Sequence, residues 1–139
     1  MGLNNLLGIS LERVEPDADI IERLLRAARR NIADSQQSTI SAENRFDAAY
    51  KAIMQLANAS LQARGYRTLT SRPGHHMTMI QSLSLTIDLD SQSIILLDSL
   101  RKQRNVADYS GDIIPMSAVN TCIDQALRLL EKIETSNLE

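Results

Sequence analysis

Apolar positions recur at intervals of three and four residues along most of the chain, which predicts five amphipathic helices. The first two span residues 19–35 and 41–64, and the second is rich in alanine. Three more are predicted at residues 74–87, 90 or 91–108, and 117–135. The segment SLSLTIDL alternates as a strand would, but its neighbours are helical and no partner strand is evident. Short connections then predict an all-α, up-and-down bundle of four or five helices.

Polar residues and glycines mark the expected helix ends. Asp19 is followed three residues later by Glu22, which is a capping signal for the first helix, and Pro16 stands just upstream. Gly65 is expected to end the second helix. We expect residues 1–139 to form a single helical domain, with residues 1–16 and 136–139 as flexible or peripheral termini.

Composition narrows the function classes. Of the 139 residues, 43% are apolar, which is enough to form one core and too many for a disordered chain. Aromatic residues make up only 3%, which argues against a surface on which nucleic-acid bases stack. One cysteine and two histidines are too few for a disulfide framework or a conventional structural metal centre, so we expect no cofactor. No segment matches a membrane span or a signal peptide, which predicts a cytoplasmic protein without membrane contact.

The net charge is −2, so nucleic-acid binding would need a local basic patch. Folding residues 74–87 and 91–108 back on each other about Leu89 places the two histidines beside Lys102, with Arg104 within a turn. If the second helix ends at the same pole, a cationic surface results. Its predicted members are Arg64, Arg67, Arg72, His75, His76, Arg101, Lys102 and Arg104. This surface is either a phosphate-binding site or a solvated surface of mixed charge.

A second basic row lies on the first helix and consists of Arg23, Arg26, Arg29 and Arg30. Such a row is usually a solvated helix face, and its alternative role is a second RNA-binding or partner-docking surface. Cys122 continues the apolar stripe of the last helix, so we expect it to be a core residue rather than a nucleophile.

Residues 97–111, LDSLRKQRNVADYSG, resemble the signature region of HEPN domains, in which an Arg near the end of a bundle helix precedes a His by a few residues. The alanine-rich residues 43–67 and the GHH that opens the next helix are also similar to that family. The resemblance covers residues 19–135 and implies a bundle that usually dimerises. In catalytic members, Arg and His from two protomers cleave RNA without metal.

Carried over to this chain, the family's Arg is Arg104, its polar residue is Asn105, and Tyr109 stands in the place of its His. Tyrosine, with an ordinary pKa near 10, is a poor base at neutral pH. The resemblance therefore favours a homodimeric module that binds RNA, a nucleotide or a partner without cutting, in a toxin–antitoxin or defence setting. Arg104, Asn105 and Tyr109 would line its groove.

Two alternatives stay open. If the helical hairpin brings Arg104 close to His75 or His76, the chain is predicted to be a metal-independent endoribonuclease in which the histidine moves protons and Arg104 stabilises phosphate charge. Otherwise the histidines are simply polar residues that open a helix. The other alternative, implied by the resemblance alone, is an adaptor that pairs with a nucleotidyltransferase or an antitoxin.

Overall fold

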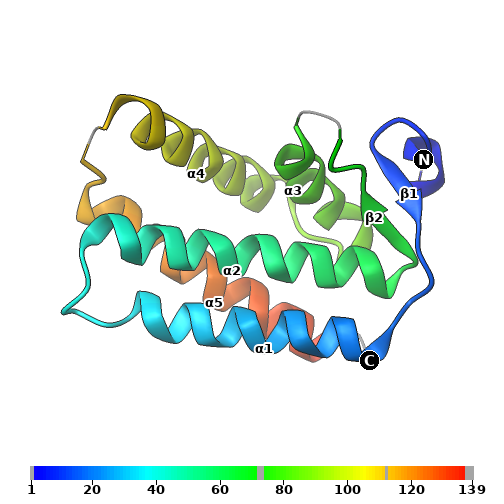
Figure 1. The fold of residues 1–139 in the computed structure, drawn as a ribbon, viewed down its shortest axis with the longest axis horizontal. Coiled ribbons are helices and arrows are strands. Elements are labelled where there is room, and N and C mark those ends of the chain that lie inside the picture. The colour runs from blue at the N-terminus through cyan, green and yellow to red at the C-terminus, as the bar shows by residue number, and fades with distance from the viewer. Residues whose placement is uncertain (1, 72–73, 112, 137–139) are drawn as a thin grey trace.

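The computed structural model describes residues 2–71, 74–111 and 113–136 (Figure 1). Five helices dominate this part of the chain, and together they confirm the all-α bundle, including the helix predicted where the sequence alternates. Their bounds are α1 Ala18–Ser35, α2 Ala42–Ala63, α3 His75–Thr86, α4 Ser91–Ser110 and α5 Met116–Ser136. Residues 137–139 of the expected C-terminal tail lie outside the described residues, and Ser136 is the last residue of α5.

Side-chain caps and a glycine set the ends of the first two helices. Asp17, rather than Asp19, caps α1: its carboxylate accepts hydrogen bonds from the N–H groups of Asp19 and Ile20. The Ser41 hydroxyl does the same at the start of α2. Gly65 has a φ of +89°, a left-handed conformation that glycine adopts without strain, and it ends α2 as predicted.

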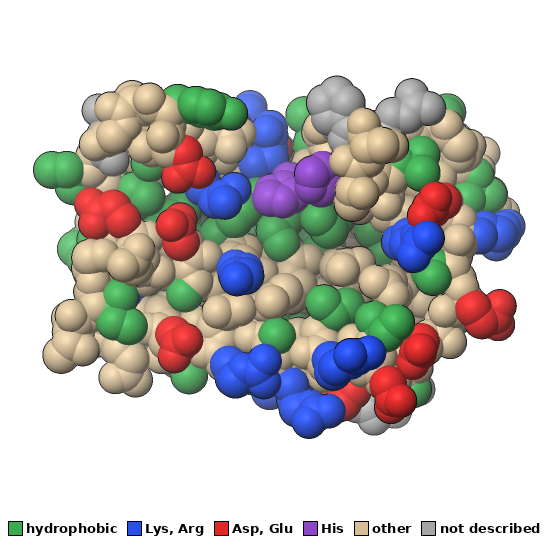
Figure 2. Space-filling view, viewed as in Figure 1, with side chains coloured by type: hydrophobic (Ala, Val, Ile, Leu, Met, Phe, Trp, Pro, Cys, Tyr) green, Lys and Arg blue, Asp and Glu red, His purple; other side chains and the backbone are tan. Residues whose placement is uncertain are grey.

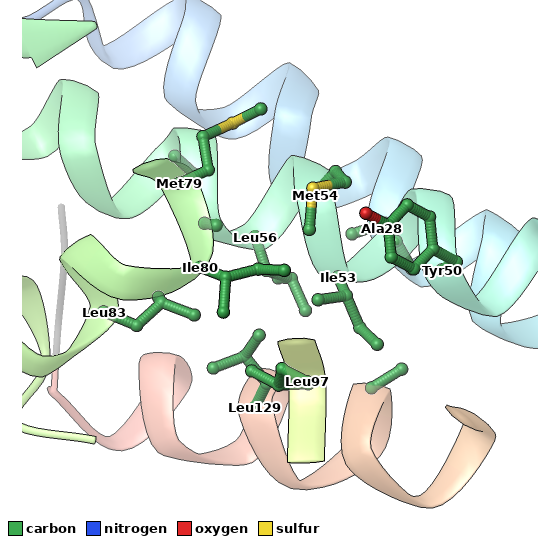
Figure 3. Close-up of a cluster of buried hydrophobic side chains, with 14 of the residues drawn as sticks. Ala28, Tyr50, Ile53, Met54, Leu56, Met79, Ile80, Leu83, Leu97 and Leu129 are labelled. Atoms are coloured by element: carbon green, nitrogen blue, oxygen red, sulfur yellow. The ribbon is translucent and has the colours of Figure 1, made fainter. Parts of the chain in front are cut away.

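The core forms around α2, which lies in the middle of the molecule and contacts each of the other four helices (Figure 1). Alanines on α2 let α1 and α5 approach closely, and larger side chains fill the space toward α3 and α4. Figure 3 shows Ile53 of α2 beside Ile80 of α3, Leu97 of α4 and Leu129 of α5, all of them buried. A helix buried on most sides is held rigidly, so it is a firm base for any site built on it.

A two-stranded ribbon that the periodicity did not predict sits at one edge of the bundle. Strand β1, Leu11–Arg13, pairs antiparallel with β2, Tyr66–Thr68, and a short 3-10 helix, Leu3–Leu6, precedes it. We expected residues 1–16 to be flexible or peripheral; this segment is at the edge, yet Leu3 and Leu11 are buried. Strands of three residues are too short to show a period-two pattern.

The ribbon also determines where α3 begins. Strand β2 leads the chain back from the end of α2, and α3 then runs toward that end again, parallel to α2 (Figure 1). Thr86, at the end of α3, lies beside Arg64 at the end of α2, whereas His76, at the start of α3, lies beside Tyr50 near the middle of α2. The histidines are therefore placed over the centre of α2 rather than over its end.

Candidate functional site

An open cleft of about 410 Å³ lies where α2, α3 and α4 meet. In Figure 2 the two histidines lie in a furrow of the surface, next to basic side chains. The residues that line the cleft are Asp47, Tyr50, Lys51, Met54, His76 and Arg104. Three helices thus contribute polar groups to one hollow, an arrangement typical of binding sites in helical bundles.

Tyr50 forms the floor of the cleft. Its ring is buried and stacks on Phe46, with the ring centroids 6.5 Å apart. Its hydroxyl oxygen lies 3.2 Å from Nδ1 of His76, within hydrogen-bonding distance. Burial raises the pKa of Tyr50 to about 12, despite the opposing effect of Arg104. The phenol therefore stays protonated at neutral pH and acts as a hydrogen-bonding group.

Arg104 lies over the face of the same ring. Its guanidinium carbon is 5.2 Å from the Tyr50 ring centroid, a cation–π distance. Its Nε lies 3.9 Å from a carboxylate oxygen of Asp47 and 3.9 Å from one of Asp108. Both separations are too long for hydrogen bonds, so the aspartates attract the guanidinium but leave its N–H donors available to a ligand. The side chain is 34% exposed, which gives a ligand access to it.

The two histidines are adjacent in the sequence, and their rings also touch. The His75 and His76 ring centroids are 4.8 Å apart, in an edge-to-face arrangement. Burial lowers the pKa of His76 from its ordinary value, and the positive charges of His75, Arg104 and Arg101 lower it further. His76 is therefore mostly neutral at pH 7 and can accept a proton.

Asp47 limits the positive charge of the cleft. Its pKa is raised chiefly by burial, against the lowering effect of Arg104, and the neighbouring carboxylates of Asp108 and Glu43 raise it further. The carboxylate lies one turn before Lys51 on the same face of α2, and both line the cleft. A bound anion would thus meet Arg104 and Lys51 as attractive groups and Asp47 as a repulsive one.

The structure brings Arg104 and both histidines together, but it does not bring Arg64 and Arg67 to them. Arg64 donates a hydrogen bond of 2.8 Å to the Thr86 carbonyl at the far end of α3, and Arg67 on β2 pairs with Glu12 on β1. The prediction that these arginines share one pole with the histidines is therefore wrong. It assumed that α3 starts where α2 ends, and the ribbon prevents this. Arg72 lies outside the described residues.

The remaining predicted residues of α4 lie away from the cleft lining. Arg101 and Lys102 form ion pairs of 2.8 and 3.4 Å with Asp98 of the same helix. Asn105 is half-buried, and Tyr109 is 92% exposed at the last turn of α4. Consecutive helix positions are rotated by roughly 100°, so 105 and 109 share a face that Arg104 does not. Of the three residues predicted to line one groove, Arg104, Asn105 and Tyr109, only Arg104 lines the cleft.

Sequence reasoning missed the contribution of α2. The periodicity of residues 41–64 places Tyr50 on the apolar stripe of its helix, and its ring is indeed buried, but the pattern assigns no role to its hydroxyl. A buried tyrosine usually has a hydrogen-bond partner, and that rule could have directed attention to the histidines. Cys122 is fully buried, and burial raises its pKa to about 12, which confirms it as a core thiol.

No protein-family model matches the chain, and no curated protein sequence matches it either. Within the described ranges, no three His, Cys, Asp or Glu side chains form a group that could hold a metal ion. None of the helices described is both long enough and apolar enough to cross a bilayer. What the cleft can do therefore follows from its own side chains.

Proposed function

We propose that this cleft binds the phosphodiester backbone of RNA and cleaves it by acid–base catalysis, with Arg104 and the two histidines as the reacting groups. The observation that carries the proposal is the convergence of the Arg104 guanidinium and the His76 imidazole on the two ends of one buried tyrosine, its ring and its hydroxyl. A guanidinium with available N–H donors beside a neutral imidazole combines a group that binds a phosphate with a group that accepts a proton. Cleavage of a phosphodiester by acid–base catalysis needs both groups.

Arg104 supplies the anion site in this proposal. A guanidinium presents its N–H donors as a planar fork that matches two phosphate oxygens. The Tyr50 ring and the two aspartates at 3.9 Å hold it in place without consuming those donors. As the 2′-oxygen attacks phosphorus, negative charge accumulates on the phosphoryl oxygens, and a preorganised guanidinium stabilises that charge.

The histidines move the protons. Neutral His76 takes the proton of the 2′-hydroxyl through Nε2 while the bond between the 2′-oxygen and phosphorus forms. His75, as an imidazolium, gives a proton to the 5′-oxygen as its bond to phosphorus breaks. The products are a 2′,3′-cyclic phosphate and a free 5′-hydroxyl, and both histidines have changed protonation state. The lowered pKa of His76 suits the base of such a pair.

Tyr50 acts as a positioning residue. For Nε2 of His76 to accept a proton, Nδ1 must carry the ring hydrogen and donate it to the Tyr50 hydroxyl oxygen. The distance of 3.2 Å between these two atoms allows that hydrogen bond. The tyrosine would then fix both the tautomer and the orientation of the base, as carboxylates and carbonyls do for catalytic histidines elsewhere.

A second candidate is RNA or nucleotide binding without cleavage. It is favoured by one observation: Tyr109, which takes the place of the motif histidine of HEPN domains, is 92% exposed and does not line the cleft. The homodimer, the toxin–antitoxin setting and the adaptor role belong to the same resemblance. Exposed apolar side chains around the C-terminal end of α4, namely Val106, Tyr109 and Ile113, would suit a protein partner.

Cleavage of a DNA strand that carries one internal uridine ribonucleotide tests the proposal, with EDTA present. We expect product ending in a 2′,3′-cyclic phosphate, detected by mass spectrometry, and no cleavage when the 2′-oxygen is methylated. Arg104→Ala and His76→Ala should each reduce the rate by about a hundredfold or more. Arg128→Ala, an exposed arginine on α5, is the matched control and should cleave normally.

The results separate the two candidates. Binding of the strand that is weakened by Arg104→Ala, without any product, would establish the binding module and remove the enzyme. Cleavage that both Arg104→Ala and His76→Ala leave untouched would show that the cleft is not the site.

A further inference from the structure

A second hollow of about 380 Å³ lies along the seam between α1 and α2. Its polar lining residues are Arg30, Asn31, Asp34, Lys51 and Gln55. Lys51 also lines the cleft beside His76 and Arg104, so the two hollows adjoin at this one lysine. A molecule that fills the cleft and extends past Lys51 would enter the second hollow.

Arg30 and Lys51, the two cations of this second hollow, form no ion pair with the described residues. Among the residues that the structure describes, no carboxylate lies within salt-bridge distance of Arg30 or Lys51. Their neighbour Arg29, by contrast, pairs with Glu22 and, at 3.0 Å, with Glu134. Asp34 also lines the hollow and offsets part of its charge.

An amide pair ties the two helices together at the floor of the hollow. Asn31 Nδ2 donates a hydrogen bond of 2.8 Å to Gln55 Oε1. This contact fixes which way each amide points and leaves the Gln55 NH₂ group as a donor to a ligand. The hollow thus offers two free cations and an oriented amide, which are groups that commonly contact phosphate and sugar oxygens.

We infer that the two hollows form one track for a single RNA strand, in which the cleft holds the phosphate that reacts and Lys51 and Arg30 bind the next phosphates along. Figure 2 shows basic side chains on this face from the histidines to the edge formed by α1. The inference rests on the proposed function and extends it: the substrate is a strand of several nucleotides that crosses from α4 over α2 to α1.

The lining of the track also determines what kind of strand it accepts. Tyr50, on the cleft floor, is the one phenylalanine, tyrosine or tryptophan among the described residues that line either hollow. Without rings on which bases stack, contact is made mainly with the phosphates, which carry no sequence information. A single strand fits better than a duplex, because in-line attack by a 2′-oxygen needs a nucleotide that is free to leave helical geometry.

The test compares strand lengths. Fluorescence anisotropy would measure binding of 2′-O-methyl uridine strands of two and eight nucleotides, which the protein cannot cleave. We expect wild-type protein to bind the longer strand about tenfold or more tightly than the shorter one. Arg30→Gln with Lys51→Gln should abolish most of that preference and make the salt dependence of eight-nucleotide binding shallower by about 1.4, at roughly 0.7 per lost phosphate contact.

A matched control removes the same charges elsewhere. Arg128→Gln with Lys132→Gln on α5 also replaces one arginine and one lysine, and it should keep the wild-type length preference. Equal affinity of wild-type protein for both lengths, an unchanged preference in the Arg30/Lys51 variant, or an equal loss in the control would overturn the track. So would displacement of the RNA by polyglutamate at the same charge concentration, since that would indicate an acidic protein as the ligand.

These failures leave the proposed function standing, because cleavage at one ribonucleotide is assigned to Arg104, His75 and His76 and does not require the second hollow. Failure of wild-type protein to bind either strand would remove the proposed function and the track together.

Discussion

The hydroxyl oxygen of Tyr50 and Nδ1 of His76 lie 3.2 Å apart, and they join the middle of α2 to the start of α3. The tyrosine side of this contact is rigid, because its ring is buried against Phe46. The histidine side is half-buried and opens to the cleft. One hydrogen bond thus connects the packed core to a group that solvent and ligands can reach.

Tyr50→Phe should slow cleavage without abolishing binding. The variant keeps the ring that supports Arg104 but loses the hydroxyl that orients His76. We expect kcat to fall by about tenfold while KM changes little, because a disoriented base weakens proton transfer more than phosphate contact. The free energy of unfolding should fall by about 1 kcal/mol, the usual value of one hydrogen bond. Steady-state kinetics and urea unfolding measure the two effects. A fall in kcat as large as that of His76→Ala would contradict a mere positioning role.

The pH dependence should show a His76 that is easier to deprotonate than an ordinary histidine. The cleavage rate should rise with pH through a pKa below the ordinary 6.5, as His76 loses its proton and becomes able to act as the base. Since the unfolded chain binds this proton more tightly, the unfolding free energy should fall as the pH drops below 6.5. NMR titration of His76 would check the value directly. In Arg104→Gln the pKa should move upward, because one of the repelling charges is gone; a downward shift would contradict this.

Asp47→Asn should tighten anion binding. The substitution removes the negative charge that faces Arg104 at 3.9 Å and that would repel a phosphate in the cleft. We expect the Kd for a uridine dinucleotide to fall by up to about fivefold, which corresponds to the upper range for a partly exposed ion pair. Anisotropy at two salt concentrations would measure it. Asp124→Asn on α5 is the control and should leave the Kd as it is. Weaker binding by Asp47→Asn would contradict the prediction, because it would mean that losing a group that holds Arg104 in place outweighs the loss of repulsion.

Two substitutions on α4, one at a buried position and one at an exposed position, should differ in their effect on the free energy of unfolding. Leu97 is buried between α2, α3 and α5, and Leu97→Ala should cost about 2–5 kcal/mol of unfolding free energy through lost burial and a cavity. Ile95, two residues earlier, is 65% exposed, and Ile95→Ala should change stability by about 0.5 kcal/mol or less. Chemical denaturation of both variants provides the measurement. Equal effects would contradict the placement of α4.

Much of the fold could be predicted because it depends on local periodicity. The stripe of residues 74–87 was ambiguous between strand and helix, and the absence of a nearby partner decided it correctly. The β1–β2 ribbon was missed because it joins Leu11 to Thr68, and two strands of three residues carry no local signal of so distant a pairing. That omission misplaced Arg64 and Arg67.

Part of the candidate site could also be predicted, because it depends on the connection between two helices that follow each other in the sequence. Helices α3 and α4 are consecutive and antiparallel, so simple reflection about Leu89 brought Arg104 near the histidines. The contribution of Tyr50 and Asp47 on α2 depends on how closely the helices pack against one another, and the spacing of apolar residues along the sequence does not determine that. Tyr50 could be assigned to the core, but the direction of its hydroxyl toward His76 required coordinates.

The short ribbon between Leu11 and Thr68 has a consequence for the order of assembly. Its two strands are separated in the sequence by α1 and α2, so their pairing closes a long stretch of chain, and we expect it to form after the local helical contacts. Because β2 leads into the histidine end of α3, we expect the cleft to be completed only when the ribbon has formed. The packing of α1 against α2 would then be in place before the cleft can bind anything.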